Sequence, residues 1–229
     1  MMRIMRATNE TCAEAGEAVV VIDVLRSFTT AAVAFAVGAR EILPVGTPAE
    51  ALALRERFPD AITMGAVRGG WPIPGFDFGN SPAALAGRDL RGRRLIQCTA
   101  GGVKGLVRSA RAEMLLAASL ACAGATARYL VRLAPRSVTL VVTGIFHTRD
   151  GDEDLACADY LAALLRGERP DTDAFARRVR ESDFGRQYTD PNHPATPAAD
   201  LDYCAVVDRF DFAMLVEQRD GLLVMRAVR

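Results

Sequence analysis

The sequence predicts an α/β protein in which helices form layers on both sides of a mostly parallel, mixed β-sheet. Short apolar runs of strand length alternate with segments of helical periodicity along most of the chain. This alternation is typical of a parallel sheet that is covered on both faces. At the end of the chain, two apolar runs flank Asp220-Gly221, a dipeptide typical of a tight hairpin turn. We expect this C-terminal β-hairpin, 212–217 and 222–228, to add antiparallel strands at an edge of the sheet.

The predicted elements follow in order along the chain. Apolar runs predict strands at 18–22, 41–45, 61–65, 94–98, 113–117 and 137–143. Helical patterns occupy 27–37, 47–58, 101–110, 122–133, 152–165 and 173–180, and Asn80-Ser81-Pro82 opens a further short helix. Gly38 is a typical C-terminal stop, and Thr47, Pro48 and Glu50 form an N-terminal signature of cap, first-turn proline and capping-box acid. The proline-rich segment 187–199 predicts a loop.

The length and composition fit one globular domain. A folded chain of 229 residues buries about 70% of the surface that the unfolded chain exposes. Its content of 50% hydrophobic and 24% charged residues is ordinary for a globular protein. We find no internal repeat and no low-complexity linker. We therefore expect a single domain over residues 1–229, with the last forty or so residues as an appended layer.

The charge and cysteine content exclude several classes of protein. The chain has 28 basic and 28 acidic residues, so it lacks the excess of basic residues that nucleic-acid binding needs. Charged residues interrupt each apolar stretch before it reaches the length of a membrane span, and residues 1–17 lack the apolar core of a signal peptide. The five cysteines are widely spaced and form no C-x-x-C pair. We expect a cytoplasmic protein with a small anionic substrate; a homodimer remains open.

Asp23 and Arg26 directly follow the first predicted apolar strand. Ligands of open α/β sheets bind beyond the carboxyl ends of the strands. A carboxylate in this position serves as a metal ligand or a base, or it caps the helix that begins near Ser27. The planar guanidinium of Arg26 suits bidentate phosphate binding, and an ion pair with Asp23 is the structural alternative.

A glycine- and proline-rich segment, residues 68–82, is the most unusual part of the sequence. It mixes rigid prolines, permissive glycines and aromatic residues around a few polar side chains, among them Arg68, Asp77, Asn80 and Ser81. Such a composition predicts an ordered loop over a site, in which Asn80 or Ser81 caps the next helix. A simple connection between strand and helix is the alternative.

Four acids in five residues precede the helix predicted at 152–165: Asp150, Asp152, Glu153 and Asp154. One or two acids stabilise a helix N-terminus through the macrodipole, but four repel one another unless a cation is near. Magnesium prefers oxygen ligands and usually takes one or two carboxylates together with substrate phosphate. We therefore expect Mg²⁺ to be bound through Glu153 or Asp154, together with Asp23.

A cysteine phosphatase is a further candidate. Cys98 leaves a strand into a glycine-rich turn, as the nucleophile of such enzymes does. Their phosphate loop needs an arginine six residues later, where this chain has Lys104, and buried free cysteine is the ordinary case. Of the two histidines, His147 lies near the acidic cluster and is an acid–base candidate, whereas His193 is expected at the surface.

Several of these motifs together resemble the ComB-like 2-phosphosulfolactate phosphatase family. The resemblance rests on Val21-Ile-Asp-Val-Leu-Arg26, on Gly75-Phe-Asp-Phe-Gly-Asn-Ser-Pro82, on the glycine-rich turn after Cys98, and on Glu153-Asp154 before a helix. It implies a three-layer α/β fold and magnesium-dependent hydrolysis of a phosphomonoester of a small sulfonated acid, a step toward coenzyme M. It implies these site residues: catalytic Asp23, Arg26 and Asp77; substrate-binding Arg68, Asn80, Ser81, Thr99, Gly101 and Gly102; metal-binding Asp23, Glu153 and Asp154.

Two departures from the family pattern bear on activity. Ala66 stands where the family usually has a glutamate, and Ala100 and Val103 stand near positions that usually carry an asparagine or a hydroxyl residue. A missing acid removes a metal ligand or a base. A non-catalytic binding protein for a small phosphorylated or sulfonated acid is therefore the alternative function.

Overall fold

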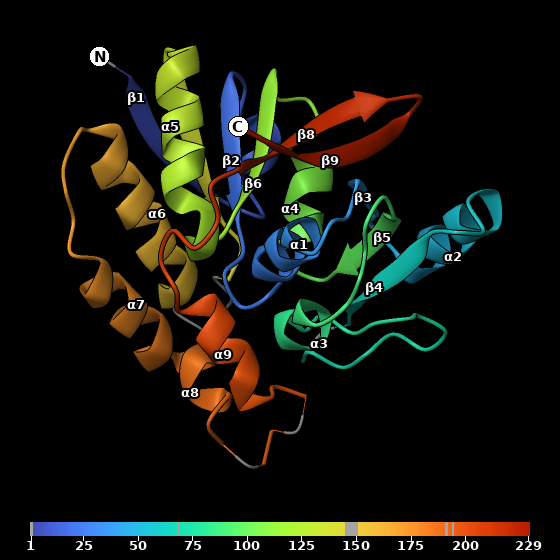
Figure 1. The fold of residues 1–229 in the computed structure, drawn as a ribbon. Helices are drawn as coiled ribbons and strands as arrows, with labels where there is room; N and C mark the ends of the chain where they lie inside the picture. The colour runs from blue at the N-terminus through green and yellow to red at the C-terminus, as the bar shows by residue number, and fades with distance from the viewer. Residues whose placement is uncertain (1, 68, 145–150, 191, 194) are drawn as a thin grey trace.

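Within the described residues of the computed structural model, nine strands form one mixed sheet in the order β1-β7-β2-β6-β8-β9-β3-β5-β4 (Figure 1). The structure describes residues 2–67, 69–144, 151–190, 192–193 and 195–229. The strands are β1 (Arg3–Thr8), β2 (Ala18–Ile22), β3 (Glu41–Pro44), β4 (Ile62–Ala66), β5 (Arg94–Thr99), β6 (Met114–Ala118), β7 (Ser137–Val142), β8 (Ala213–Arg219) and β9 (Leu222–Val228). The helices are α1 (Ser27–Ala36), α2 (Pro48–Arg57), α3 (Pro82–Ala86), α4 (Gly102–Arg108), α5 (Ala123–Leu133), α6 (Asp152–Leu165), α7 (Thr172–Glu181), α8 (Asp183–Gln187) and α9 (Ala198–Cys204), with 3-10 turns η1 (Cys12–Glu14) and η2 (Leu120–Cys122). The predicted α/β class is confirmed.

An antiparallel hairpin joins two parallel halves of this sheet. Strands β1, β7, β2 and β6 run parallel, and so do β3, β5 and β4. The hairpin β8–β9 lies between them, with β8 antiparallel to β6 and β9 antiparallel to β3. The prediction of edge strands is therefore wrong: Met214 and Met225 are fully buried in the middle of the sheet. Apolar alternation reveals the hairpin, but the pairing partners of its outer edges depend on the whole fold.

The sheet separates the core into two sides because successive strand residues point to opposite faces. On β2, Val20 and Ile22 pack with α5 and α6, whereas Val19 and Val21 pack with α1 and α4. Figure 1 shows α5 and α6 on one side of these strands and α1 on the other. A third apolar cluster lies under α2 on the β3–β5–β4 half. This arrangement is the predicted three-layer architecture.

Three elements differ from the sequence-based expectation. The strand β1 was not predicted, because Arg3, Met5 and Arg6 are exposed at the edge of the sheet and leave no apolar run. Helices α8 and α9 were not predicted either. Each is short, and α8 begins with a Ser182 cap whose Oγ accepts from the Gly185 amide at 2.9 Å. The predicted capping box of α2 is present, with both Thr47 and Glu50 making their bonds.

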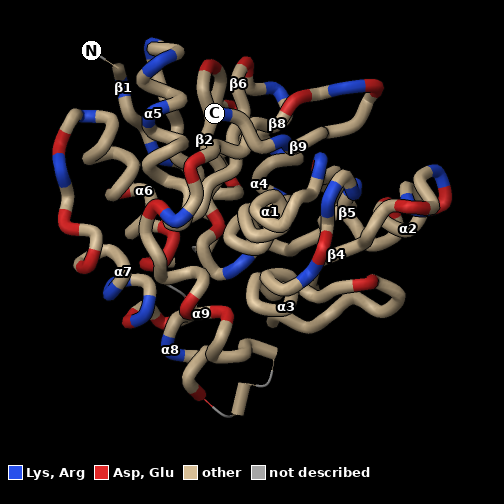
Figure 2. Tube along the Cα trace, viewed as in Figure 1, with Lys and Arg blue, Asp and Glu red and all other residues tan. Residues whose placement is uncertain are grey.

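Acidic and basic residues are interspersed along the outer helices and loops (Figure 2). In the described part of the chain, no helix combines the length and apolar character needed to cross a membrane.

Candidate active site

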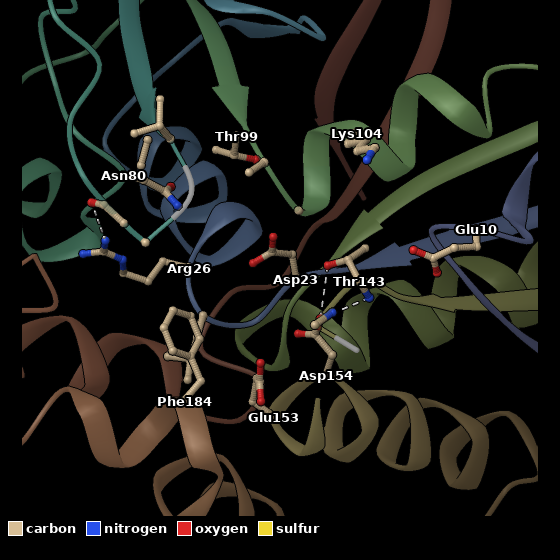
Figure 3. Close-up of a pocket in the computed structure, with 18 residues that line it drawn as sticks. Glu10, Asp23, Arg26, Asn80, Thr99, Lys104, Thr143, Glu153, Asp154 and Phe184 are labelled. Atoms are coloured by element: carbon tan, nitrogen blue, oxygen red, sulfur yellow. Dashed lines mark hydrogen bonds between the residues drawn. The ribbon is translucent and has the colours of Figure 1, made fainter. Parts of the chain in front are cut away.

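A cavity of about 490 Å³ lies at the carboxyl ends of β2, β4, β5 and β7 (Figure 3). This is the edge at which parallel strands present ligand-binding residues. The cavity is lined by Glu10, Asp23, Leu25, Arg26, Ala66, Val67, Gly69, Gly70, Asn80, Thr99, Ala100, Gly101, Lys104, Thr143, Gly144, Glu153, Asp154 and Phe184. It therefore brings together seven of the residues singled out in the sequence: Asp23, Arg26, Asn80, Thr99, Gly101, Glu153 and Asp154.

Asp23 lies at the centre of the cavity in Figure 3, one residue beyond the end of β2. Its Oδ1 accepts a 2.9 Å hydrogen bond from the Ser27 amide, and its Oδ2 accepts a 2.7 Å bond from the Gly102 amide. Burial raises the pKa of Asp23, although these two amides and the charge of Arg26 act in the opposite direction. The carboxylate thus makes the helix-start contact expected of a cap and also lines the cavity.

Glycine residues allow the turn before α4 to approach Asp23 closely. A Cβ atom at Gly101 would lie 2.9 Å from Oδ2 of Asp23, and one at Gly102 would lie 2.8 Å from its Cβ. Any larger residue at these positions would displace the acid or the turn. The glycine-rich sequence after Cys98 therefore serves to bring backbone against a carboxylate.

Asp154 is held by the ends of two neighbouring strands. Its Oδ1 accepts from the Val24 amide at 2.7 Å, and its Oδ2 accepts from the Gly144 amide at 2.8 Å and from the Thr143 amide and hydroxyl at 3.2 and 3.1 Å. Burial, followed by the negative charges of Glu153 and Asp23, raises the pKa of Asp154 well above its usual range. Glu153 and Asp23 are consequently close enough to oppose the ionisation of Asp154.

Glu153 is the third buried acid of the cavity, with 3% of its surface exposed. A Cβ atom at Gly144 would lie 2.7 Å from its Oε1 and 3.1 Å from Oδ2 of Asp154. Glycine at this position therefore leaves room for both carboxylates at the end of β7.

The chemistry of these donors fits a magnesium ion. Carboxylates are the oxygen ligands that Mg²⁺ prefers, and a nearby cation would favour the charged form of acids that burial now disfavours. No three acidic, histidine or cysteine side chains among the described residues converge as a ready-made metal cluster. Magnesium does not require one, because it keeps several waters and usually binds one or two protein carboxylates together with phosphate.

Arg26 lines the cavity but does not form the expected ion pair with Asp23. Its Nη1 donates instead to Oδ2 of Asp200 at 2.6 Å, and both side chains are almost fully buried. Asp200 lies on the unpredicted helix α9, 174 residues away along the chain. The sequence offered no local signal for this pairing.

Lys104 and Glu10 line the cavity on the side opposite Arg26 (Figure 3). Sequence reasoning did not assign either residue to the site. Glu10 accepts from the Thr8 hydroxyl at 2.7 Å, and this bond, supported by the charges of Arg108 and Lys104, lowers its pKa. Lys104 therefore provides a cationic group across the buried acids from Arg26.

The side chains of two predicted substrate-binding residues, Thr99 and Asn80, line the cavity. The Thr99 hydroxyl lies 2.8 Å from that of Ser27 and accepts from the Val103 amide at 3.3 Å. Asn80 has a buried side-chain oxygen without a hydrogen-bond partner among the described groups. By contrast, the Gly102 amide is already bound to Asp23, so it does not serve as a free donor.

The structure places Asp77 and Ser81 outside the cavity lining as described. The Asp77 carboxylate accepts from the Thr63 amide and hydroxyl, both at 2.8 Å, and from Arg55 at 3.0 Å. Burial opposes ionisation, but these bonds prevail and lower the pKa of Asp77. Ser81 caps α3 through the Ala84 amide and donates to Asp200 at 2.6 Å. Both residues thus hold the loop in place, and the expectation of a catalytic Asp77 is not supported by its position.

Cys98 does not have the surroundings of a nucleophile. It is 4% exposed and is not among the residues that line the cavity. Burial raises the pKa of its thiol to about 11, so the thiolate is scarce at neutral pH. A Cβ atom at Gly65 would lie 1.9 Å from the carbonyl oxygen of Cys98, so the neighbouring strand packs tightly against this residue.

Three sequence-based candidates, Arg68, His147 and Asp150, lie outside the described residues. The remaining acid of the cluster, Asp152, pairs with Arg178 on α7 at 2.5 Å and does not line the cavity. His193 is half exposed, as expected, and lies 3.8 Å from Asp190.

Comparison with known proteins shows the family. A sequence model described as 2-phosphosulpholactate phosphatase matches residues 4–219. The chain belongs to the 2-phosphosulfolactate phosphatase family. Three similar relatives are each described as a probable 2-phosphosulfolactate phosphatase. The protein of Bacillus subtilis (strain 168) is 36% identical over 88% of this chain and 87% of its own length. The protein of Carboxydothermus hydrogenoformans is 33% identical over 93% of this chain and 92% of its own length. The protein of Deinococcus radiodurans is 37% identical over 81% of this chain and 81% of its own length.

The matched region of this 2-phosphosulfolactate phosphatase family member includes the residues that form the cavity, from Glu10 to Phe184. It also includes Asp200. The family therefore spans both the strand ends that carry the acids and the C-terminal segment that pairs with Arg26.

Proposed function

We propose that this chain is a magnesium-dependent phosphatase that hydrolyses a phosphomonoester of a small sulfonated or carboxylated acid such as 2-phosphosulfolactate. The description of the family states this reaction, and the cavity at the strand ends is lined by acidic and basic groups that suit it.

The observation that carries the proposal is the set of three buried acids, Asp23, Glu153 and Asp154, in one cavity that also exposes Arg26 and Lys104. Buried carboxylates need a cation or hydrogen-bond donors. Backbone amides hold Asp23 and Asp154, yet burial raises the pKa of both, and the charges of Glu153 and Asp23 raise that of Asp154 further. A cation that supports both the acids and a phosphate accounts for this arrangement.

In the proposed reaction, Asp23 together with Glu153 or Asp154 would hold Mg²⁺. When bound, the ion would neutralise charge on the phosphoryl oxygens. Arg26 contributes a fixed positive charge and N–H donors to the phosphoryl group, which favours the transition state if the donors are aligned beforehand. Water attacks phosphorus and the ester P–O bond breaks. The central Asp23 carboxylate takes one proton of the attacking water and passes it to the departing alkoxide oxygen, so that the products are the alcohol and inorganic phosphate.

Lys104 supports the choice of a substrate with a second anionic group. It lies across the acids from Arg26, so phosphate and a sulfonate or carboxylate can each meet a cation (Figure 3). A lysine ammonium is a point charge that accepts either kind of anion. We therefore assign Lys104 to the non-reacting anionic end of the substrate.

The test is a phosphate-release assay with and without magnesium. The panel contains 2-phosphosulfolactate, 2-phosphomalate with a carboxylate in place of the sulfonate, and phospholactate, which keeps its own carboxylate but has a methyl group where the sulfonate-bearing carbon stands. We expect release from the first two, loss of activity in chelator and recovery on adding Mg²⁺. Equal turnover with and without chelator would contradict the magnesium proposal, and no release from any substrate would contradict phosphatase chemistry.

A non-catalytic binding protein is the second candidate, and Ala66 favours it. Ala66 lines the cavity with a methyl group at the end of β4, so this strand end contributes no carboxylate to the cavity. Calorimetry with the same compounds separates the two functions. Binding of 2-phosphosulfolactate without phosphate release would favour the binding protein.

A further inference from the structure

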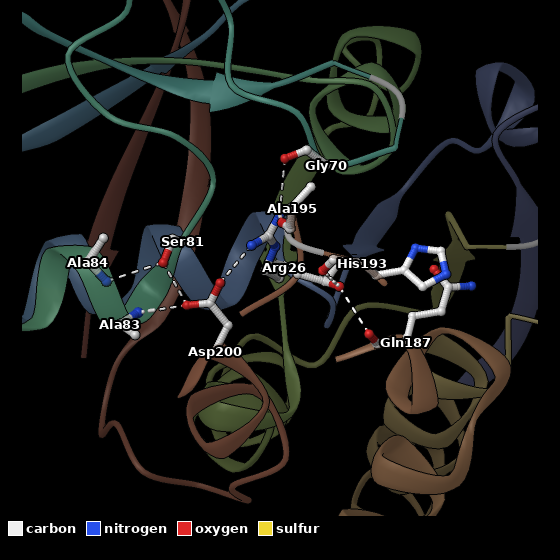
Figure 4. Close-up of polar contacts among 10 residues, drawn as sticks. Arg26, Gly70, Ser81, Ala83, Ala84, Gln187, His193, Ala195 and Asp200 are labelled. Atoms are coloured by element: carbon white, nitrogen blue, oxygen red, sulfur yellow. Dashed lines mark hydrogen bonds and ion pairs between the residues drawn. The ribbon is translucent and has the colours of Figure 1, made fainter. Parts of the chain in front are cut away.

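Arg26 lines one wall of the cavity and forms a buried ion pair with Asp200, which does not line the cavity itself (Figure 4). The side chain of Arg26 is 4% exposed and that of Asp200 is fully buried, with Nη1 and Oδ2 separated by 2.6 Å. A buried ion pair stabilises a fold no better than apolar residues of similar volume, because desolvation offsets the attraction. Packing alone therefore does not explain why charged residues occupy this wall.

The guanidinium of Arg26 also ties two loops together. Its Nη2 donates to the Gly70 carbonyl at 3.3 Å and to the Ala195 carbonyl at 3.0 Å. Gly70 belongs to the loop between β4 and α3, and Ala195 to the loop between α8 and α9. In Figure 4 both carbonyl groups lie beside the same guanidinium.

The other carboxylate oxygen of Asp200 extends the network to α3. Oδ1 accepts from the Ser81 hydroxyl at 2.6 Å and from the Ala83 amide at 3.0 Å. Asp200 therefore has fixed partners on both oxygens, and its position determines that of Arg26.

These contacts engage three of the five N–H groups of an arginine, and the other two have no hydrogen-bond partner within the described part of the chain. The ring of Tyr188 lies against the guanidinium, 5.5 Å from Cζ to the ring centroid, and limits its rotation. Arg26 nevertheless lines the cavity.

We propose that Asp200 is a positioning residue: it fixes the guanidinium of Arg26 toward the cavity and, through it, joins the β4–α3 and α8–α9 loops into one wall. The part of this inference that concerns phosphate rests on the proposed function. The joining of the loops does not.

The first experiment is a double-mutant cycle with Asp200→Asn and Arg26→Lys, scored by kcat/KM for 2-phosphosulfolactate. Each single variant should lose at least tenfold, mainly through a higher KM. The double variant should be little worse than Arg26→Lys, because Asp200 acts through Arg26. The matched control is Asp202→Asn on the same helix, whose exposed carboxylate pairs with Arg180 and should change kcat/KM less than twofold. The proposal would be overturned if the losses of kcat/KM in the two single variants multiplied in the double variant, or if Asp200→Asn kept the kcat/KM of the wild type.

The second experiment needs no activity: hydrogen exchange of the wild type and variants, with calorimetry of inorganic phosphate in magnesium. Each loop contains an internal backbone hydrogen bond. The Gly70 amide donates to the Val67 carbonyl, and the Thr196 amide donates to the His193 carbonyl, so exchange of these two amides reports the order of each loop. In Asp200→Asn, exchange should rise in both loops together and phosphate should bind at least tenfold more weakly.

If Asp200→Asn does not fold, the same measurements on Arg26→Lys decide. Lysine lacks the planar fork that reaches Asp200 and the two carbonyls from one group, and with only three N–H donors it would keep none for a ligand. Unchanged exchange in either loop would refute the joined wall. Inactivity of the wild type toward every phosphomonoester would refute the proposed function alone and leave the exchange test valid.

Discussion

The amide of Gly102 donates a 2.7 Å hydrogen bond to Oδ2 of Asp23, and this contact links the start of α4 to the acid at the centre of the cavity. The two residues are 79 positions apart along the chain. A residue with a side chain at position 102 would meet Cβ and Oδ2 of Asp23 and the ring of Phe28, all within 2.8 to 2.9 Å.

Gly102→Ala should therefore displace Asp23 and reduce kcat at least tenfold, with a loss of stability of about 1–3 kcal/mol from overpacking. Steady-state kinetics and thermal melts measure both effects. Gly87→Ala is the control, since a Cβ atom there meets nothing within 4 Å. An active Gly102→Ala enzyme would show that the position of Asp23 matters little.

Asp23 and Asp77 offer a matched pair of aspartates inside and outside the cavity. Asp23→Asn should reduce phosphate release at least a hundredfold without unfolding the protein. Asp77→Asn should retain activity within threefold but lower the melting temperature, because Arg55 loses its charged partner. The opposite pattern would restore Asp77 as the catalytic acid and remove Asp23 from the mechanism.

Ala66→Glu should raise magnesium affinity and phosphatase activity. Ala66 lines the cavity, so a carboxylate there would add an oxygen ligand next to the three acids. A magnesium titration by calorimetry compares the variant with the wild type, and Ala84→Glu on exposed α3 surface controls for the added charge. A folded Ala66→Glu variant that binds magnesium no better would show that position 66 does not face the ion.

Cys98→Ser should leave phosphate release within twofold of the wild type. The thiol is buried, and its pKa of about 11 keeps it protonated at neutral pH. The assay is run with magnesium and with chelator. Activity that survives chelation but is lost in Cys98→Ser would establish a cysteine phosphatase instead.

Glu41 should make stability depend on pH in the acid range. Burial acts to raise its pKa, but hydrogen bonds from Arg226, Arg94 and Arg40 lower it to about 2. Because the folded-state pKa is below the unfolded value near 4.5, this stabilisation is complete above pH 4.5 and is lost as pH falls toward 2. Urea unfolding of Glu41→Gln should show a weaker decline over that window, whereas Glu217→Gln, in an exposed ion pair, should decline as the wild type does. Parallel curves for all three proteins would contradict this role.

Local sequence signals predicted most of the fold. The strands β2, β3, β4, β5, β6 and β7 and the helix α6 lie within a residue or two of their expected positions, because apolar runs and caps act locally. The unpredicted elements are short or polar. The place of the hairpin in the sheet depends on pairing between β8 and β6 and between β9 and β3, which no local pattern encodes.

The site residues also divide into those that the local sequence marks and those that only the whole fold brings to the cavity. Asp23, Glu153 and Asp154 follow strand ends or begin a helix, positions that the sequence marks. Asp200 and Phe184 lie on helices that were not predicted, and Lys104 was weighed only as a departure from an arginine motif. Asp77 belongs to a distinctive motif, but distinctiveness does not reveal the direction of a side chain, and Thr63 and Arg55 hold this one away from the cavity.

The central hairpin sets an order on assembly. Residues 213–228, near the end of the chain, connect strands that are made much earlier, β6 on one side and β3 on the other. During synthesis the two parallel halves can each begin to form, but neither has its inner neighbour until the hairpin emerges from the ribosome. Contacts over such long sequence separations close slowly. The chain therefore has two unpaired strand edges until residues 213–228 have been synthesised, which makes nascent molecules susceptible to pairing with one another.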